Sequence, residues 1–97
     1  MIKVRFLSTA QADLISIRQY SLGEFGASVA DGYFLGFQKV WALLREYPLA
    51  GAAKPELGPD IRCYVHRSHR FFYSIEDDVV LIRRVVHHAM NVRRALQ

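Results

Sequence analysis

The sequence predicts an α+β domain in which a helical hairpin packs on one face of a small antiparallel sheet. Three observations support this fold class. Apolar and polar residues alternate at the N-terminus, two long segments then repeat apolar residues at helical spacing, and the C-terminal half returns to alternation. The predicted order is strand, helix, helix, strand, strand, strand.

The chain is expected to form one domain over residues 1–97. Its 97 residues are enough to close a single small core, and a second core would need a longer chain. Hydrophobic residues make up 52% of the sequence and charged residues 23%, which is the balance of a folded chain and not of a disordered one.

The first strand and the first helix follow each other directly. Ile2, Val4 and Phe6 alternate with basic residues, which is typical of a strand with one buried face. The pair Ser8-Thr9 is placed to cap a helix that Gly26 ends. The apolar positions of this helix are Ala10, Leu14, Ile17, Leu22 and Phe25.

The second helix has the clearer apolar stripe, and Pro48 ends it. Aromatic residues at this spacing indicate core packing and not a ligand site. We expect Val40, Trp41 and Leu44 to face the sheet. The full stripe comprises Ala30, Tyr33, Phe34, Phe37, Val40, Trp41, Leu44 and Tyr47.

A loop over residues 49–60 leads to three strands joined by short turns. The strands alternate over residues 61–66, 70–75 and 79–88, and the turn 76–78 is acidic. They form an antiparallel meander. One helical hairpin covers only one face of such a sheet, so the opposite face is expected to be wet or covered by a partner. The pattern leaves open which face that is.

Charge and composition restrict the partners. The net charge is +4 and the pI is near 9.6, and seven arginines follow Ile61 against three acids. This basic half suits either nucleic acid or an acidic protein segment, and charge alone does not choose between them. No apolar run approaches the ~20 residues that span a membrane, and the N-terminus lacks a signal-peptide core. The single cysteine, Cys63, cannot form an internal disulfide, and it is expected to be a buried small hydrophobe. Because this fits a reducing compartment, the chain is expected in the cytoplasm.

The residues that could carry chemistry lie in the last quarter. Adjacent residues of a strand point to opposite faces, so His87 and His88 are poor joint ligands. The same alternation pairs Arg83 with His87 and Arg84 with His88. His66 and His69 bracket a turn, but no metal-ligand motif, no nucleophile with a base and no glycine-rich phosphate loop accompanies them. We expect no metal and no cofactor.

Metal-free RNA cleavage is the remaining catalytic hypothesis. Arginines can stabilise a pentavalent phosphate while a histidine transfers protons. The candidate set is Arg62, Arg70, Arg83 and His87. The alternative interpretation, that these arginines form a solvated or partner-binding sheet face, is favoured by the charge pattern.

Three segments resemble the ParE-type toxins of the RelE/ParE superfamily. They are "KPELGPDIRCYV", "HRFFYSIEDDVVLIRRVVHH" and "HHAMNVRRAL", and the resemblance covers nearly the whole chain in this order. It implies a RelE/ParE-like fold and the toxin half of a bacterial type II toxin-antitoxin pair. One branch of the superfamily cleaves ribosome-bound mRNA, and the ParE branch is associated with poisoning DNA gyrase.

Two features separate the branches. Arg70 resembles an arginine of the cleaving branch, but no tyrosine follows Tyr73, and the tail reads Ala89-Met90-Asn91-Val92 where cleaving members hold basic and phenolic groups. The resemblance therefore implies a non-catalytic poison of gyrase with a ParD-type antitoxin as partner. The expected target contacts are Arg83, Arg84, His87, His88, Arg93 and Arg94.

Other activities share the pattern. A ribosome-dependent mRNA endoribonuclease is the alternative function, and a relic that only binds its antitoxin would look the same. Direct nucleic-acid binding stays open, and the sequence assigns no antitoxin-binding residues.

Overall fold

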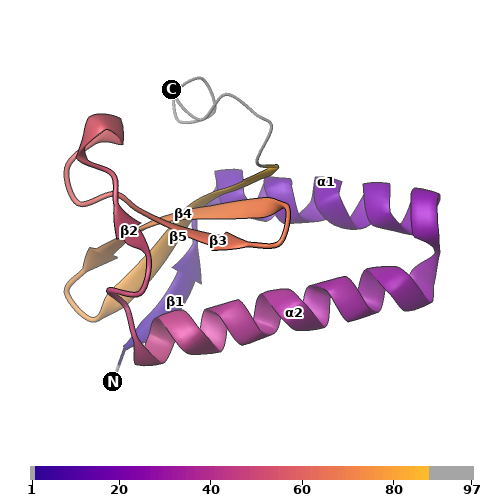
Figure 1. Ribbon diagram of the computed structural model, residues 1–97, viewed down its shortest axis with the longest axis horizontal. Coiled ribbons are helices and arrows are strands. Elements are labelled where there is room, and N and C mark those ends of the chain that lie inside the picture. The colour runs from indigo at the N-terminus through magenta and orange to yellow at the C-terminus, as the bar shows by residue number, and fades with distance from the viewer. Residues whose placement is uncertain (1, 88–97) are drawn as a thin grey trace.

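The computed structural model describes residues 2–87 (Figure 1). Two helices pack on a five-stranded sheet, which confirms the predicted fold class. The elements are β1 Lys3–Phe6, α1 Ser8–Phe25, α2 Ala27–Glu46, β2 Ala52–Ala53, the 3-10 turn η1 Pro55–Leu57, β3 Arg62–His66, β4 His69–Glu76 and β5 Val79–His87.

The two helices form a hairpin that closes at Gly26. This residue has φ 86°, in a region that side chains other than glycine rarely adopt, so the chain can reverse in one residue. The closed end of the hairpin extends past the strands (Figure 1). At the other end, α2 finishes at Glu46, just before Pro48, as the sequence predicts.

The start of α1 differs from the prediction. Leu7 occupies the N-cap position, and no side-chain hydrogen bond caps the helix there. Thr9 lies inside the first turn, and its Oγ1 donates to the carbonyl oxygen of Arg83 at 2.9 Å. The Ser8-Thr9 pair therefore marks the helix start, but Thr9 joins α1 to β5 and does not cap the helix.

The sheet is mixed, with the order β1-β5-β4-β3-β2. β3, β4 and β5 form the predicted antiparallel meander, whereas β1 runs parallel to β5. The connection from β1 to β5 runs through the helical hairpin and then through β2, β3 and β4, which is long enough for the two strands to lie parallel. β2 lies in the predicted loop and pairs Ala52 with Cys63 and Ala53 with Arg62, too short a strand to show alternation.

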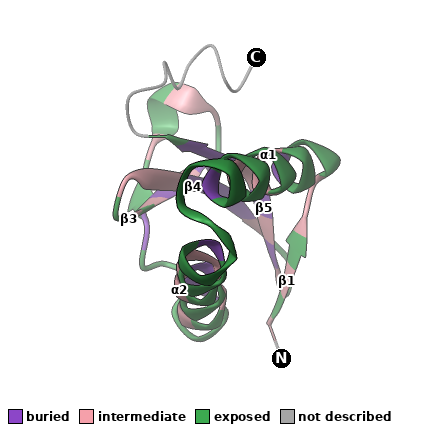
Figure 2. Ribbon diagram, turned by 90° about the vertical axis from the view of Figure 1, so that its right-hand side faces the viewer, coloured by how far each residue is buried: buried purple, intermediate pink, exposed green. Residues whose placement is uncertain are grey.

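The main core lies between the helices and the sheet, on what we call the helix face (Figure 2). Val40 and Leu44 are buried and Trp41 packs against them, as predicted. Phe25 and Tyr47 are 60% and 62% exposed, so their assignment to the apolar stripe was wrong. Phe25 lies at the closed end of the hairpin, past the strands, and Tyr47 follows the last residue of α2, where the backbone has left the helical conformation. The buried core comprises Ala10, Phe37, Val40, Leu44, Phe71, Tyr73, Val80, Ile82 and Val85.

The opposite face of the sheet, the outer face, carries a second cluster. Ile61, Cys63, Phe72 and Val86 are buried there, and Leu57 of η1 packs against them. The loop before β3 thus covers part of a face that was expected to be wet or to wait for a partner. Cys63 is a buried small residue, as predicted, and burial raises the pKa of its thiol.

Between residues 2 and 87, no helix has the length and apolar character needed to cross a membrane.

Candidate functional site

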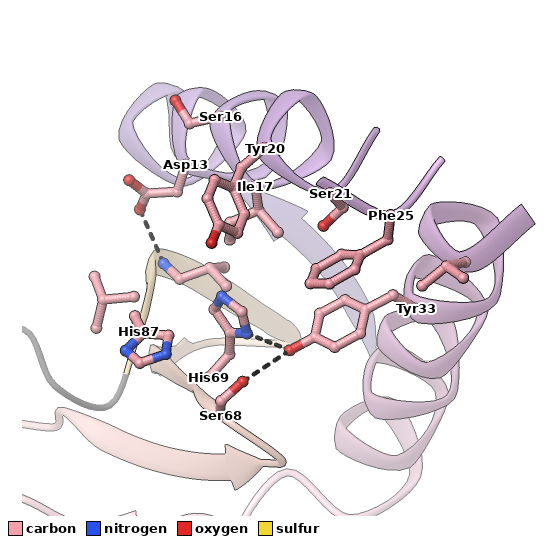
Figure 3. A pocket seen from close by; sticks show the side chains of 13 residues that line it. Asp13, Ser16, Ile17, Tyr20, Ser21, Phe25, Tyr33, Ser68, His69 and His87 are labelled. Atoms are coloured by element: carbon pink, nitrogen blue, oxygen red, sulfur yellow. Dashed lines mark hydrogen bonds between the residues drawn. The ribbon is translucent and has the colours of Figure 1, made fainter. Parts of the chain in front are cut away.

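A groove opens between the projecting helical hairpin and the ends of β4 and β5 (Figure 3). Its volume is about 610 Å³, within the range of ligand and peptide sites. Most of its wall is apolar. The lining residues are Asp13, Ser16, Ile17, Tyr20, Ser21, Phe25, Val29, Tyr33, Ser68, His69, Val85, Val86 and His87.

A polar group forms one wall of this groove. The hydroxyl of Tyr33 on α2 hydrogen-bonds with Nδ1 of His69 and lies 3.3 Å from Oγ of Ser68 (Figure 3). The His69 ring meets the His87 ring edge to face, with centroids 5.7 Å apart. These contacts connect α2 with the start of β4 and the end of β5, so this wall of the groove is held in a fixed position.

Asp13 on α1 fastens the end of β5 to the groove. Its carboxylate accepts hydrogen bonds from Nε and Nη2 of Arg84 at 2.7 and 3.0 Å, and from the backbone N–H of Val85 at 2.9 Å. This bidentate pair raises the pKa of Arg84, so the guanidinium remains charged. Both side chains are mostly shielded from solvent.

A bulge in β5 changes which residues share a face. Tyr73 pairs with Ile82 and Phe72 with Arg84, so Arg83 is an extra residue between two ladder positions. Arg83 donates to Oγ of Ser74 at 3.5 Å, on the outer face, whereas His87 lines the groove on the helix face. The predicted pairing of Arg83 with His87 on one face was therefore wrong, because strict alternation does not survive a bulge.

Arg62 has a structural role in the loop after α2. Its Nη1 donates to the carbonyl oxygens of Gly51 at 2.7 Å and Leu49 at 3.4 Å. Tyr73 supports the same loop, donating to the carbonyl of Pro48 at 2.7 Å and accepting from the Gly51 N–H at 2.9 Å.

The four candidate catalytic residues do not gather at one place. Arg62 faces the loop after α2, and Arg83 lies beside Ser74 on the outer face. His69 and Phe71 face the helices, so Arg70, which lies between them in β4, faces outward. His87 lines the groove on the helix face. The sheet thus lies between Arg70 and His87, and the structure brings no arginine of this set to the histidine.

The predicted target contacts divide in two. Arg83, Arg84 and His87 lie at the end of β5, and Arg84 is held by Asp13. His88, Arg93 and Arg94 lie outside the described residues.

The histidines do not form a metal site in the described part of the chain. Within residues 2–87, no three side chains from histidine, cysteine, aspartate and glutamate come together so that they could hold an ion. His66 packs its ring against Phe37, and burial, with Arg67 next, lowers the pKa of His66.

Sequence reasoning missed the residues that build the groove. Tyr33 was assigned to the core and Asp13 was not considered. The spacing of Thr9 and Asp13, one helical turn apart beside an arginine-rich strand, is the signal that could have found the second. No local signal links Tyr33 with His69, because the contact joins residues 36 positions apart.

Comparison with known proteins assigns the family. A family model described as ParE toxin of type II toxin-antitoxin system, parDE, matches residues 4–92. The chain belongs to the ParE toxin family. This confirms the resemblance seen in the sequence. No curated protein sequence matches this ParE-family chain.

Two solved structures share the fold of this ParE-family chain. One, from the chromosomal ParDE toxin-antitoxin system of P. aeruginosa, has a TM-score of 0.76 and 19% identity over 90% of this chain and 96% of that one. The other, from the toxin-antitoxin complex RelBE2 of Mycobacterium tuberculosis, has a TM-score of 0.63 and 26% identity over 92% and 93%. Both match nearly whole chains, so the likeness covers the sheet and the hairpin together.

Proposed function

We propose that this ParE-family chain is a toxin that acts without catalysis, as a poison of DNA gyrase. The observation that carries the proposal is the separation of Arg70 from His87 by the sheet. Acid-base cleavage of RNA needs a proton donor and a charge-stabilising arginine at the same phosphate. A binding poison needs only a complementary surface, and a basic strand end meets that requirement.

The target contacts are proposed at the end of β5 and in the basic residues that follow it. Arg83 contributes from the outer face, and His87 contributes from the groove. The guanidinium of Arg84 is already neutralised by Asp13, so its share is smaller than that of Arg93 and Arg94.

The partner is proposed to be a ParD-type antitoxin, and both proteins are proposed to act in the cytoplasm. Tyr20, Phe25 and Val29 line the groove and are 65%, 60% and 54% exposed. Neighbouring apolar side chains of this size are typical of a surface that a partner covers. An acidic and apolar antitoxin segment would shield them and offset the net charge of +4.

Expression from a repressible promoter tests the activity. Cells are induced and assayed in parallel for gyrase-linked DNA breaks and for mRNA cuts at ribosomes. DNA breaks without mRNA cuts are expected. Specific mRNA cuts with intact DNA would overturn the proposal.

The second candidate function is a ribosome-dependent mRNA endoribonuclease. The observation in its favour is the 26% identity with the chain from the RelBE2 complex, higher than the 19% with the ParDE system. Arg70, on the outer face, is the arginine that this function would use.

A further inference from the structure

A second depression lies on the outer face of the sheet, between the loop that precedes β3 and the strands β4 and β5. Its volume is about 410 Å³, enough for one or two side chains of a partner. It shares no lining residue with the groove on the helix face. We call it the Arg83 pocket, and the lining residues that matter here are Leu57, Asp60, Ile61, Ser74, Glu76 and Arg83.

The loop side of the Arg83 pocket is held in place by the fold. Leu57 packs against Ile61 in the outer-face cluster. The N–H of Lys54 donates to the carbonyl oxygen of Ile61 at 2.8 Å, and the N–H of Gly58 donates to that of Pro55 at 3.2 Å. The pocket is therefore formed before a partner arrives, so little ordering is needed on binding.

The guanidinium of Arg83 is the cation of this pocket. Within residues 2–87 its one hydrogen bond is to Oγ of Ser74, at 3.5 Å. The ion pairs in this part of the chain join Arg18 to Asp31 and Arg84 to Asp13, so Arg83 has no carboxylate partner there. A guanidinium is a planar fork of donors that fits the two oxygens of a carboxylate. Apolar walls from Leu57 and Ile61 would strengthen such a pair by limiting its contact with water.

Two exposed acids at the same pocket restrict the anion that can enter. Asp60 and Glu76 both line it, and they repel an anion that arrives alone. A carboxylate with a basic side chain beside it satisfies Arg83 and the two acids together. A nucleic-acid backbone carries phosphate after phosphate and no cation of its own, so its neighbouring phosphates would meet the acids. The charges thus favour a protein surface over nucleic acid.

We infer that the Arg83 pocket receives an aspartate or glutamate side chain of the target protein, with a lysine or arginine of that protein against Asp60 and Glu76. The inference rests on the proposed function, in which the target is gyrase, and it assigns the outer face to direct contact with protein. Arg83 then determines specificity through its paired hydrogen bonds as well as its charge.

The experiment measures the affinity of the purified toxin for gyrase in the absence of DNA. Arg83→Gln should bind at least ~10-fold more weakly, because the target carboxylate loses its partner. Arg83→Lys should still bind at least about fivefold more weakly, because an ammonium keeps the charge but not the fork. The control is Lys39→Gln, which removes one exposed positive charge from α2 and should stay within about twofold.

The two acids give a test with opposite signs for protein and nucleic acid. Asp60→Asn with Glu76→Gln should weaken gyrase binding about threefold or more, because the basic side chain of the target loses its partners. Asparagine tolerates the left-handed backbone of Asp60, whose φ is 63°. Glu24→Gln with Glu46→Gln changes the net charge equally on the two helices and should not weaken binding. A phosphate ligand would instead bind the Asp60-Glu76 variant more tightly.

The outcomes separate this inference from the proposed function. Wild-type binding to gyrase that is unchanged in Arg83→Gln and Arg83→Lys would overturn the pocket and leave the gyrase target standing. No binding of the wild-type toxin to gyrase would overturn both. If the Arg83 variants lost affinity only for a labelled DNA duplex, or only for the antitoxin, the pocket would belong to that partner and the inference would be wrong. Equal melting temperatures of wild type and variants show that each loss is local.

Discussion

Asp13 on α1 holds the Arg84 side chain and the Val85 backbone of β5 with the same carboxylate. β1 pairs with β5 only as far as Ile82, so the edge of β5 beyond that point needs other partners. Thr9 and Asp13, one helical turn apart on α1, provide them. The end of β5, and with it the wall of the groove, is positioned by a helix in place of a strand.

Replacing Asp13 should therefore destabilise the domain. Asp13→Ala leaves a partly buried guanidinium and a strand amide without their acceptor, and we expect a loss of about 2–4 kcal/mol in the free energy of unfolding. The control is Asp31→Ala, which breaks the exposed pair with Arg18 and should cost at most ~1 kcal/mol. Urea unfolding of both variants checks this. Equal urea midpoints for Asp13→Ala and Asp31→Ala would show that the Asp13 contacts stabilise the fold no more than an exposed ion pair does.

Gly51 is expected to be the least replaceable glycine. A Cβ there would lie 2.7 Å from Oη of Tyr73 and 2.9 Å from the carbonyl oxygen of Cys63. Gly51→Ala should cost more than about 2 kcal/mol, because it pushes the loop off the Tyr73 hydroxyl that bonds it.

The matched control for this prediction is Gly32→Ala in α2, where a Cβ meets nothing within 4 Å. Alanine favours a helix over glycine by up to ~1 kcal/mol, so this variant should melt at a higher temperature than the wild type. Thermal melts of the two variants should move in opposite directions. A Gly51→Ala midpoint at or above that of the wild type would mean that the loop has room to shift.

Trp41 is expected to contribute a large share of the core's stability. Its ring packs edge to face on Phe6 and Phe71, with centroids 4.9 and 5.1 Å away, so it joins α2 to β1 and β4. Trp41→Ala should remove ~3–5 kcal/mol. Leu35→Ala, on the same helix but 58% exposed, should change stability by less than about 0.5 kcal/mol. Chemical denaturation distinguishes the two, and a similar loss in both would place Trp41 outside the core.

The sequence predicts the parts of this fold that repeat along the chain. Helical spacing over α2 and alternation over β3 and β4 each span several residues, so the burial of Phe37, Val40 and Phe71 follows from pattern alone. What pattern cannot supply is pairing between distant segments. β1 lies beside β5 although two helices and three strands separate them in the chain, and nothing in either strand encodes that choice locally.

The candidate site depended on features that periodicity hides. One extra residue at Arg83 was enough to separate it from His87, and a bulge leaves no reliable mark in a β-branched run. The aromatic stripe correctly placed Tyr33 near the core, but its hydroxyl reaches His69 at the rim. Residues with an apolar ring and a polar tip often sit at such boundaries, and burial patterns report only the ring.

Protonation of His66 should make the domain less stable in acid. Burial, reinforced by Arg67, lowers the pKa of His66 in the folded state below its ordinary value of 6.5. Between the two pKa values the unfolded chain binds more protons, so stability falls as the pH drops through 6.5 and the loss is complete below the folded-state pKa.

Two variants isolate this effect. In His66→Gln the fall in urea midpoint between about pH 7.5 and pH 5 should be smaller than in the wild type. Arg67→Gln should give an intermediate fall, because it removes the second cause and leaves the first. A wild-type slope that persists unchanged in His66→Gln would assign the pH dependence to other groups.

The last prediction separates catalysis from binding through Arg70 and His87. Were the chain a ribonuclease, alanine at either position should lower the cleavage rate ~100-fold or more, because both groups would act on one transition state. The structure places them on opposite faces of the sheet, so we expect no such joint loss. His87→Ala should leave growth arrest nearly unchanged, whereas Arg93→Ala with Arg94→Ala should weaken target binding and relieve it. The measurement is growth after induction of the toxin alone, with protein levels matched by immunoblot. Cleavage of mRNA that disappears in both Arg70→Ala and His87→Ala would show that the two residues meet at a substrate, and the non-catalytic assignment would then be wrong.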